Sequence, residues 1–163
     1  MKQACPQTVV VNVADCAGDI QEWFLDALGR PGGERVEFLI RAKCNRRLAT
    51  GTEPRYLWEV MQRARPLGRI TFELSRPADR PSRRVTLSVK AMPVTYNGAR
   101  RPGGRLPPVR VWAIYAIELK SPKGEEPIEG LLLTSLPGEG FSEAGMVVQW
   151  YGCRWDRTFF PRA

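Results

Sequence analysis

The chain has 163 residues, 43% of them apolar, which is enough to bury the core of one domain or of one domain with a large insertion. The 25 Lys and Arg residues outnumber the 17 Asp and Glu residues, giving a net charge of +8. This excess suits a polyanionic partner, although a merely soluble basic protein has the same balance. The sequence contains no histidine, which excludes Ser-His-Asp catalysis, histidine general bases and histidine-containing zinc sites.

The four cysteines form no C-x-x-C pair, which argues against a zinc cluster. The N-terminal residues lack the apolar segment of a secretory signal, so a disulfide framework is not expected. No stretch approaches the roughly 18 apolar residues of a membrane span. We therefore expect a cytoplasmic protein in a reducing setting, with no membrane partner.

Residues 8–15 predict a buried strand that ends on a carboxylate. Four valines in five positions favour a strand, and an almost continuous apolar run suits a central one. Asp15 closes the run, at the position where open α/β sheets place their ligands. The alternative is that Asp15 is a turn or helix-cap residue, as Asp often is.

Residues 19–28 predict a short amphipathic helix, because their apolar residues recur at helical spacing. Residues 35–43 then predict a second strand. A strand, a helix and a strand with a short return form a βαβ unit, which implies a parallel strand pair.

The pattern changes after about residue 45. Residues 56–65 predict a short helix, and alternating or apolar runs predict strands at 70–74, 84–90, 109–119 and 131–135. Residues 97–108 read as a basic, flexible loop. From residue 141 the pattern is helical again, with Ala144, Val147, Val148 and Tyr151 on one face. These segments predict an antiparallel β module inserted into an α/β framework.

Several motifs, in this order, resemble the catalytic domain of bacterial cut-and-paste insertion-sequence transposases of the DDE class (the IS-four and Tn-five type). Asp15-Cys16-Ala17-Gly18-Asp19-Ile20 is similar to the family's D-R-E-x-D-I, and Arg41-Ala42-Lys43 is similar to its basic run on the next strand. Leu131–Ser135 resembles the strand that ends the family's β insertion. Tyr151 and Arg154 match the first two positions of its signature Y-x-x-R-x-x-x-E-x-x-x-x-x-x-K.

The resemblance implies an α/β fold: a partial ribonuclease H-like core in residues 1–44, a mostly β insertion in 45–140, and a truncated helix returning to the core in 141–163. It implies that Asp15 is a catalytic metal ligand for Mg²⁺ or Mn²⁺, and that Arg41, Lys43, Tyr151 and Arg154 bind DNA phosphates. Cleavage and transfer of a DNA strand need two metals held by carboxylates about 3.5–4 Å apart. Without the resemblance, Arg41 and Lys43 read as a solvated strand end and Tyr151 as a core residue.

The chain departs from the family pattern at the other two metal ligands. The first catalytic Asp should precede Asp15 by many residues and has no counterpart, and Thr158 stands where the family has its Glu. We therefore expect a transposase fragment, truncated at both ends, that binds metal weakly and is inactive alone. The alternatives are a non-catalytic, basic DNA-binding module for transposon ends and an inhibitor of full-length transposase.

Overall fold

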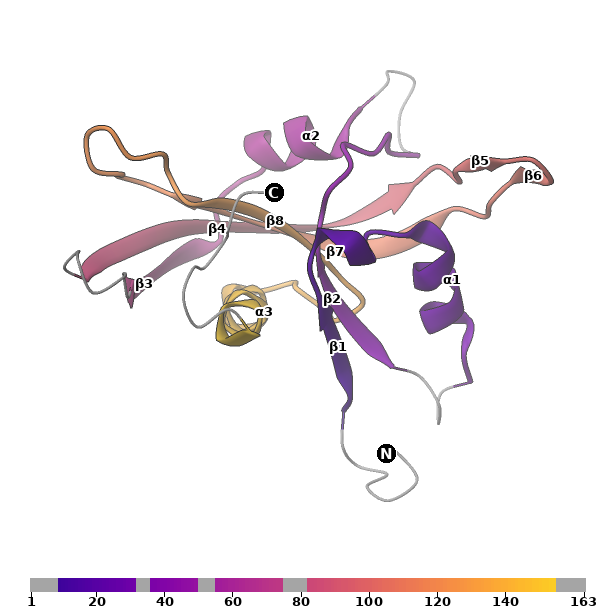
Figure 1. The fold of residues 1–163 in the computed structure, drawn as a ribbon, viewed down its shortest axis with the longest axis horizontal. Coiled ribbons are helices and arrows are strands. Elements are labelled where there is room, and N and C mark those ends of the chain that lie inside the picture. Colours follow the sequence, from indigo (N-terminus) through magenta and orange to yellow (C-terminus); the bar gives the residue numbers. More distant parts are fainter. Residues whose placement is uncertain (1–8, 32–35, 50–54, 75–81, 155–163) are drawn as a thin grey trace.

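The structure is a computed structural model that describes residues 9–31, 36–49, 55–74 and 82–154 (Figure 1). In chain order the elements are β1 (Val11–Ala14), a 3₁₀ turn (Cys16–Gly18), α1 (Gln21–Gly29), β2 (Glu37–Arg41), α2 (Leu57–Arg63), β3 (Gly68–Leu74), β4 (Arg83–Tyr96), β5 (Arg100–Arg101), β6 (Gly104–Arg105), β7 (Val109–Glu118), β8 (Glu129–Thr134) and α3 (Phe141–Arg154).

Six strands form one curled, mixed sheet in the order β1-β2-β8-β7-β4-β3. β1 and β2 are parallel, with Val13 opposite Leu39, which confirms the parallel pair expected from the βαβ pattern. The other neighbours are antiparallel. β8 pairs directly with β2, so the strands after residue 45 continue the same sheet. The α/β class is confirmed at this level.

Helices cover both faces of the sheet. α1 and α2 pack on one face together with Phe38 and Ile40 of β2, whereas Leu39 faces the other side, where α3 packs (Figure 1). This division follows from the two-residue period of a strand, which sends neighbouring side chains to opposite faces. The continuous apolar run of β2 is thus explained by burial on both sides.

α3 buries the stripe expected from its sequence: Ala144, Val147, Val148 and Tyr151 all lie in the apolar cluster on its side of the sheet. The predicted amphipathic helix is confirmed. Among the described residues, the helices are too short or too polar to cross a membrane.

Two parts of the β region differ from expectation. β4 continues to Tyr96, beyond the predicted end at residue 90, and includes Pro93. β3 pairs with β4 only as far as Val89, so at Pro93 the only neighbouring strand among the described residues is β7. Proline is tolerated there because it has no N–H to donate and no described strand pairs with the other side of β4. Residues 97–108 were expected to be a flexible loop, yet they contain the two-stranded hairpin β5–β6, which projects from one end of the sheet (Figure 1).

Candidate nucleic-acid interface

Asp15 lies directly after β1, at the carboxyl end of the parallel pair. Its side chain caps the 3₁₀ turn: the Ala17 N–H donates to Asp15 Oδ1 at 2.9 Å. The turn folds tightly over the end of the strand: a Cβ added to Gly18 would lie only 2.8 Å from the Ala14 Cβ. Asp15 therefore has the capping role that its residue type allows, and its role as a metal ligand stays a prediction.

A second carboxylate, Asp19, organises the segment that follows β2. Its side chain is fully buried. Asp19 Oδ2 accepts the backbone N–H groups of Lys43 and Cys44 at 2.8 and 3.0 Å. Asp19 Oδ1 accepts Nε and Nη2 of Arg46 at 3.1 and 2.5 Å. This one carboxylate ties the end of β2 to the start of α1.

The basic residues after β2 have different surroundings. Arg41, the last residue of β2, lies opposite Leu132 of β8. The Lys43 backbone is held by Asp19 while its side chain is exposed. Both residues lie at the carboxyl end of β2, beside the segment that begins with Asp15. Their contacts with DNA phosphates stay predictions.

Tyr151 and Arg154 come from α3, on the other face of the sheet. Tyr151 is 1% exposed and packs in the apolar cluster with Val147 and Val148. α3 packs against β4 and β7. The Arg154 side chain and Thr158 lie outside the described part of the chain. Phosphate binding by Tyr151 and Arg154 stays a prediction, and the described position of Tyr151 fits a core role.

The described carboxylates do not fit a two-metal site. Among the described residues there is no group of three or more Asp, Glu, Cys or His side chains that could hold a metal. Asp19, the nearest carboxylate to Asp15 in the sequence, accepts four N–H bonds including two from Arg46. A carboxylate whose oxygens are occupied by cationic and backbone donors is a poor ligand for a hydrated Mg²⁺ ion.

A hollow rich in arginine lies beside the Asp19 carboxylate. Its volume is about 280 Å³, and it is lined by Gln21, Arg46, Arg47, Asn97, Gly98, Ala99 and Arg105. Asp19 neutralises Arg46, whereas Arg47 and Arg105 form no ion pair with another described residue. The lining contains cationic and amide groups and no carboxylate. Such a lining suits an anion with several oxygens, and arginine's planar donor fork matches phosphate.

The hollow has a fixed wall because the 97–108 segment is fastened to α1. The Gln21 side-chain amide donates to the Pro107 carbonyl and accepts the Ala99 N–H, both at 3.0 Å. Glu22 and Arg101 form an ion pair, and this hydrogen-bonded guanidinium lowers the pKa of the Glu22 carboxyl. These contacts hold the segment that carries Arg105 against α1.

Tyr96 lies beneath this region. Its ring is 5.5 Å from the Arg46 guanidinium carbon, a cation–π distance. Its hydroxyl is buried and has no hydrogen-bond partner within the described part of the chain. Burial raises the pKa of Tyr96 well above its ordinary value, with the Asp19 charge acting in the same direction. Tyr96 therefore stays neutral and supports Arg46 by packing.

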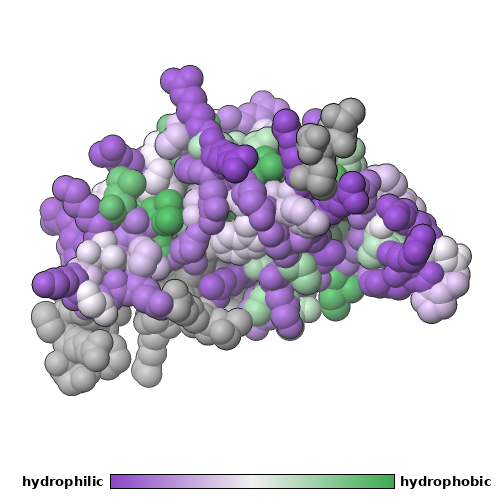
Figure 2. Space-filling view, turned by 90° about the horizontal axis from the view of Figure 1, so that it is seen from above, coloured by the Kyte–Doolittle hydropathy of each residue, from purple (hydrophilic) through white to green (hydrophobic). Residues whose placement is uncertain are grey.

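The face above α2 is mainly hydrophilic, from the end of the sheet across to the β5–β6 hairpin (Figure 2). Sequence reasoning named Asp15, Arg41 and Lys43, whose roles stay predictions, and did not single out Asp19, Arg46, Arg47 or Gln21 as site residues. Their sequence signal was weak: Asp19 reads as a helix start, and Arg46 and Arg47 read as solvated loop residues.

A search of the chain against protein-family models found no match.

Proposed function

We propose that this chain is a DNA-binding protein derived from a DDE-class transposase, with a partial ribonuclease H-like core. It binds DNA through the phosphate backbone and does not cleave it. In this proposal the protein is cytoplasmic, and its ligand is DNA that carries transposon ends. Binding there would make the chain a competitor of full-length transposase for the same ends.

The support for descent from a transposase is the arrangement at the carboxyl ends of β1 and β2. The two strands are parallel and adjacent, Asp15 follows the first, and Arg41 and Lys43 lie at the end of the second. This arrangement agrees with the motif order in the sequence. In this proposal the β strands between β2 and α3 correspond to the family's insertion.

The observation that carries DNA binding is the hollow that Arg47 and Arg105 help to line. It combines cationic walls, amide donors and a wall fixed by Gln21, and its lining has no carboxylate that would repel a bound anion. Arg46 is already paired with the buried Asp19 carboxylate, so Arg47 and Arg105 supply the positive charge that attracts a DNA phosphate. Phosphate contacts position a protein on DNA without reading its sequence.

The proposal excludes catalysis because of the residues present. Asp15 and Asp19 both accept N–H donors, and Thr158 offers a hydroxyl where the family has an anionic ligand. A hydroxyl cannot replace a carboxylate in holding Mg²⁺. Without two metals, neither the attacking nor the leaving oxygen is stabilised.

The binding test is a salt titration of duplex DNA affinity by fluorescence anisotropy. The logarithm of affinity should fall linearly with the logarithm of salt concentration, by about 0.9 per neutralised phosphate. The double variant Arg47→Gln, Arg105→Gln should make the slope shallower by about 1.8. Lys120→Gln, Lys123→Gln removes the same charge from the exposed β7–β8 loop at the other end of the sheet (Figure 1) and should change the slope little.

Absence of duplex binding at low salt would overturn the proposal, and equal effects of the two double variants would remove the hollow's role. A separate assay for nicking or end joining with Mg²⁺ or Mn²⁺ should show no turnover. Turnover that persists through purification and disappears in Asp15→Ala would show that the chain is a working enzyme.

A further inference from the structure

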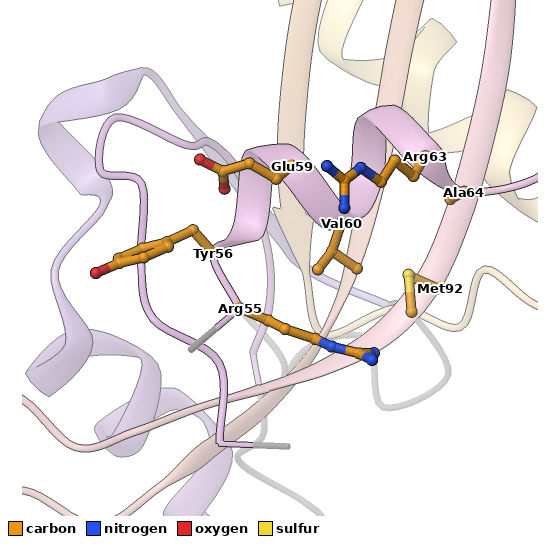
Figure 3. A pocket seen from close by; sticks show the side chains of 7 residues that line it. All are labelled: Arg55, Tyr56, Glu59, Val60, Arg63, Ala64 and Met92. Carbon is orange, nitrogen blue, oxygen red and sulfur yellow. The ribbon is translucent and has the colours of Figure 1, made fainter. Parts of the chain in front are cut away.

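A second hollow lies between α2 and β4, outside the interface described above. Its volume is about 580 Å³. Figure 3 shows Arg55 and Arg63 reaching over it from opposite sides, with Val60 and Met92 between them. An adjoining hollow of about 260 Å³ shares Arg55, Val60 and Met92 and adds Arg110 of β7. The two hollows therefore form one groove.

The groove exists because β4 extends beyond β3. Past Val89 the free side of β4 faces α2 and the segment around Leu48. Among the described residues, Leu48 bridges Tyr96, the Ala49 N–H donates to the Thr95 carbonyl at 2.7 Å, and the Lys90 ammonium donates to the Gln62 carbonyl of α2. Met92 and Pro93 lie in the stretch that remains open. The groove is thus built from regular elements with a fixed register.

The arginines of the groove differ from several other arginines of this protein in lacking an ion pair with a described residue. Arg30, Arg46, Arg83, Arg84 and Arg101 each pair with a carboxylate. Arg55, Arg63 and Arg110 form no ion pair with any other described residue. The carboxylate at the rim, Glu59, accepts the Asn45 side-chain amide at 3.1 Å. The groove therefore carries three arginines and one carboxylate, Glu59, which leaves an excess of positive charge.

The floor of the groove is apolar. Val60 and Met92 are half-buried and pack at the edge of the core. A methionine thioether contacts aromatic rings favourably, and arginine also stacks on flat rings. A ligand that uses both the floor and the walls must combine a flat ring with anions on either side of it.

A nucleotide within a strand has this combination, with one base and a phosphate on each side. In a duplex the bases are stacked inside, so only an unpaired base reaches a floor of this kind. We propose that the groove between α2 and β4 binds unpaired nucleic acid, with a base on Val60 and Met92 and phosphates on Arg55, Arg63 and Arg110. This inference rests on the proposed function, because it assigns a single-stranded segment to a protein that holds DNA elsewhere.

The test compares two dye-labelled oligomers with equal numbers of phosphates, oligothymidine and an abasic oligomer, at one salt concentration. The protein should bind oligothymidine on the order of tenfold or more tightly, because stacking of one base adds that much. Met92→Gln keeps the charge and the unbranched shape, and it should reduce this difference to about twofold. Met146→Gln, on the exposed side of α3, is the matched control and should preserve it.

The charges are tested separately. Arg55→Gln, Arg63→Gln should weaken both oligomers in parallel, whereas Arg69→Gln, Lys123→Gln, at exposed positions outside the groove, should weaken them less. Val60→Thr changes the floor from the helix side and should reproduce the effect of Met92→Gln, so the floor can be tested even if one variant folds poorly. Circular dichroism verifies folding of each variant.

Equal binding of the two oligomers, with duplex binding intact, would overturn this inference and leave the proposed function standing. Failure to bind any nucleic acid at low salt would overturn both. An acidic peptide containing aromatic residues also offers anions and rings, and it should not displace oligothymidine. Displacement at comparable concentrations would assign the groove to a protein ligand and overturn the inference.

Discussion

The Asp19 carboxylate accepts two hydrogen bonds from the Arg46 guanidinium across 27 residues of sequence, and Arg46 Nη2 also donates to the Asp19 carbonyl at 2.7 Å. The carboxylate is fully buried and Arg46 is 16% exposed. The pair joins the start of α1 to the segment after β2, and it sets the position of one wall of the arginine-lined hollow.

Asp19→Asn should therefore destabilise the fold strongly. The amide keeps the shape but leaves the Arg46 charge without its partner, and breaking one side of a buried pair costs about 3–5 kcal/mol. Asp26→Asn is the control, because the exposed pair of Asp26 with Arg30 should contribute about 0–1 kcal/mol. Urea unfolding followed by circular dichroism measures both, and equal losses would show that Asp19 has no special structural role.

The sequence predicts the parts of this fold that depend on neighbours in the chain. The valines of β1 and the helical spacing in α1 indicate the βαβ unit, and the stripe of α3 indicates its buried face. Local pattern could not predict the Asp19–Arg46 pair, because it depends on where the chain returns after β2. Likewise, the groove depends on β4 extending past the end of its pairing with β3. That depends on how the two strands pair and not on the types of their residues.

The hairpin illustrates the same limit. Residues 97–108 are rich in Gly, Pro and Arg, a composition typical of a solvated loop. Their order comes from Gln21, on another element, and from close backbone packing. The sequence points to Asp15, Arg41 and Lys43 because they lie at or just after strand ends, and their roles stay predictions, whereas Arg47 and Arg105 are brought together only by the tertiary fold.

Tyr96→Phe should stabilise the protein, or leave it unchanged, at neutral pH. The Tyr96 hydroxyl is buried and finds no acceptor among the described residues, and an unsatisfied buried polar group costs about 1–3 kcal/mol. A clear loss of stability at neutral pH would show that the hydroxyl has a partner that matters.

The same variant should weaken the alkaline loss of stability. Burial raises the pKa of Tyr96 in the folded state, so above about pH 10 the unfolded chain releases this proton and the folded protein keeps it. Stability then falls as pH rises, by about 1.4 kcal/mol per pH unit for one such group. Urea unfolding between pH 8 and 11 should show a shallower decline in Tyr96→Phe, whereas the exposed Tyr56→Phe should match the parent protein.

Gly98→Ala should disrupt the base of the β5–β6 hairpin. A Cβ at this position would lie 1.5 Å from the Leu106 carbonyl oxygen, so the backbone must move. Overpacking of this kind costs about 1–3 kcal/mol, and displacement of Arg105 should also weaken DNA binding. Gly103→Ala is the matched control, since no atom lies within 4 Å of its added Cβ. Unfolding and anisotropy measurements on both variants check the prediction, and indistinguishable behaviour would contradict the hairpin geometry.

Asp15 can be assigned as a cap or a metal ligand by comparing two substitutions. Asp15→Ala removes the acceptor for the Ala17 N–H and should cost about 0.5–2 kcal/mol, whereas Asp15→Asn keeps an acceptor oxygen and should cost less. We expect Mg²⁺ to change the stability of the parent protein little, because the neighbouring carboxylate, Asp19, already accepts hydrogen bonds from Arg46 and from backbone N–H groups. Neither substitution should alter this small effect. Thermal melts with and without Mg²⁺ measure both quantities. A stabilisation by Mg²⁺ in the parent protein that both variants lose would instead establish Asp15 as a metal ligand.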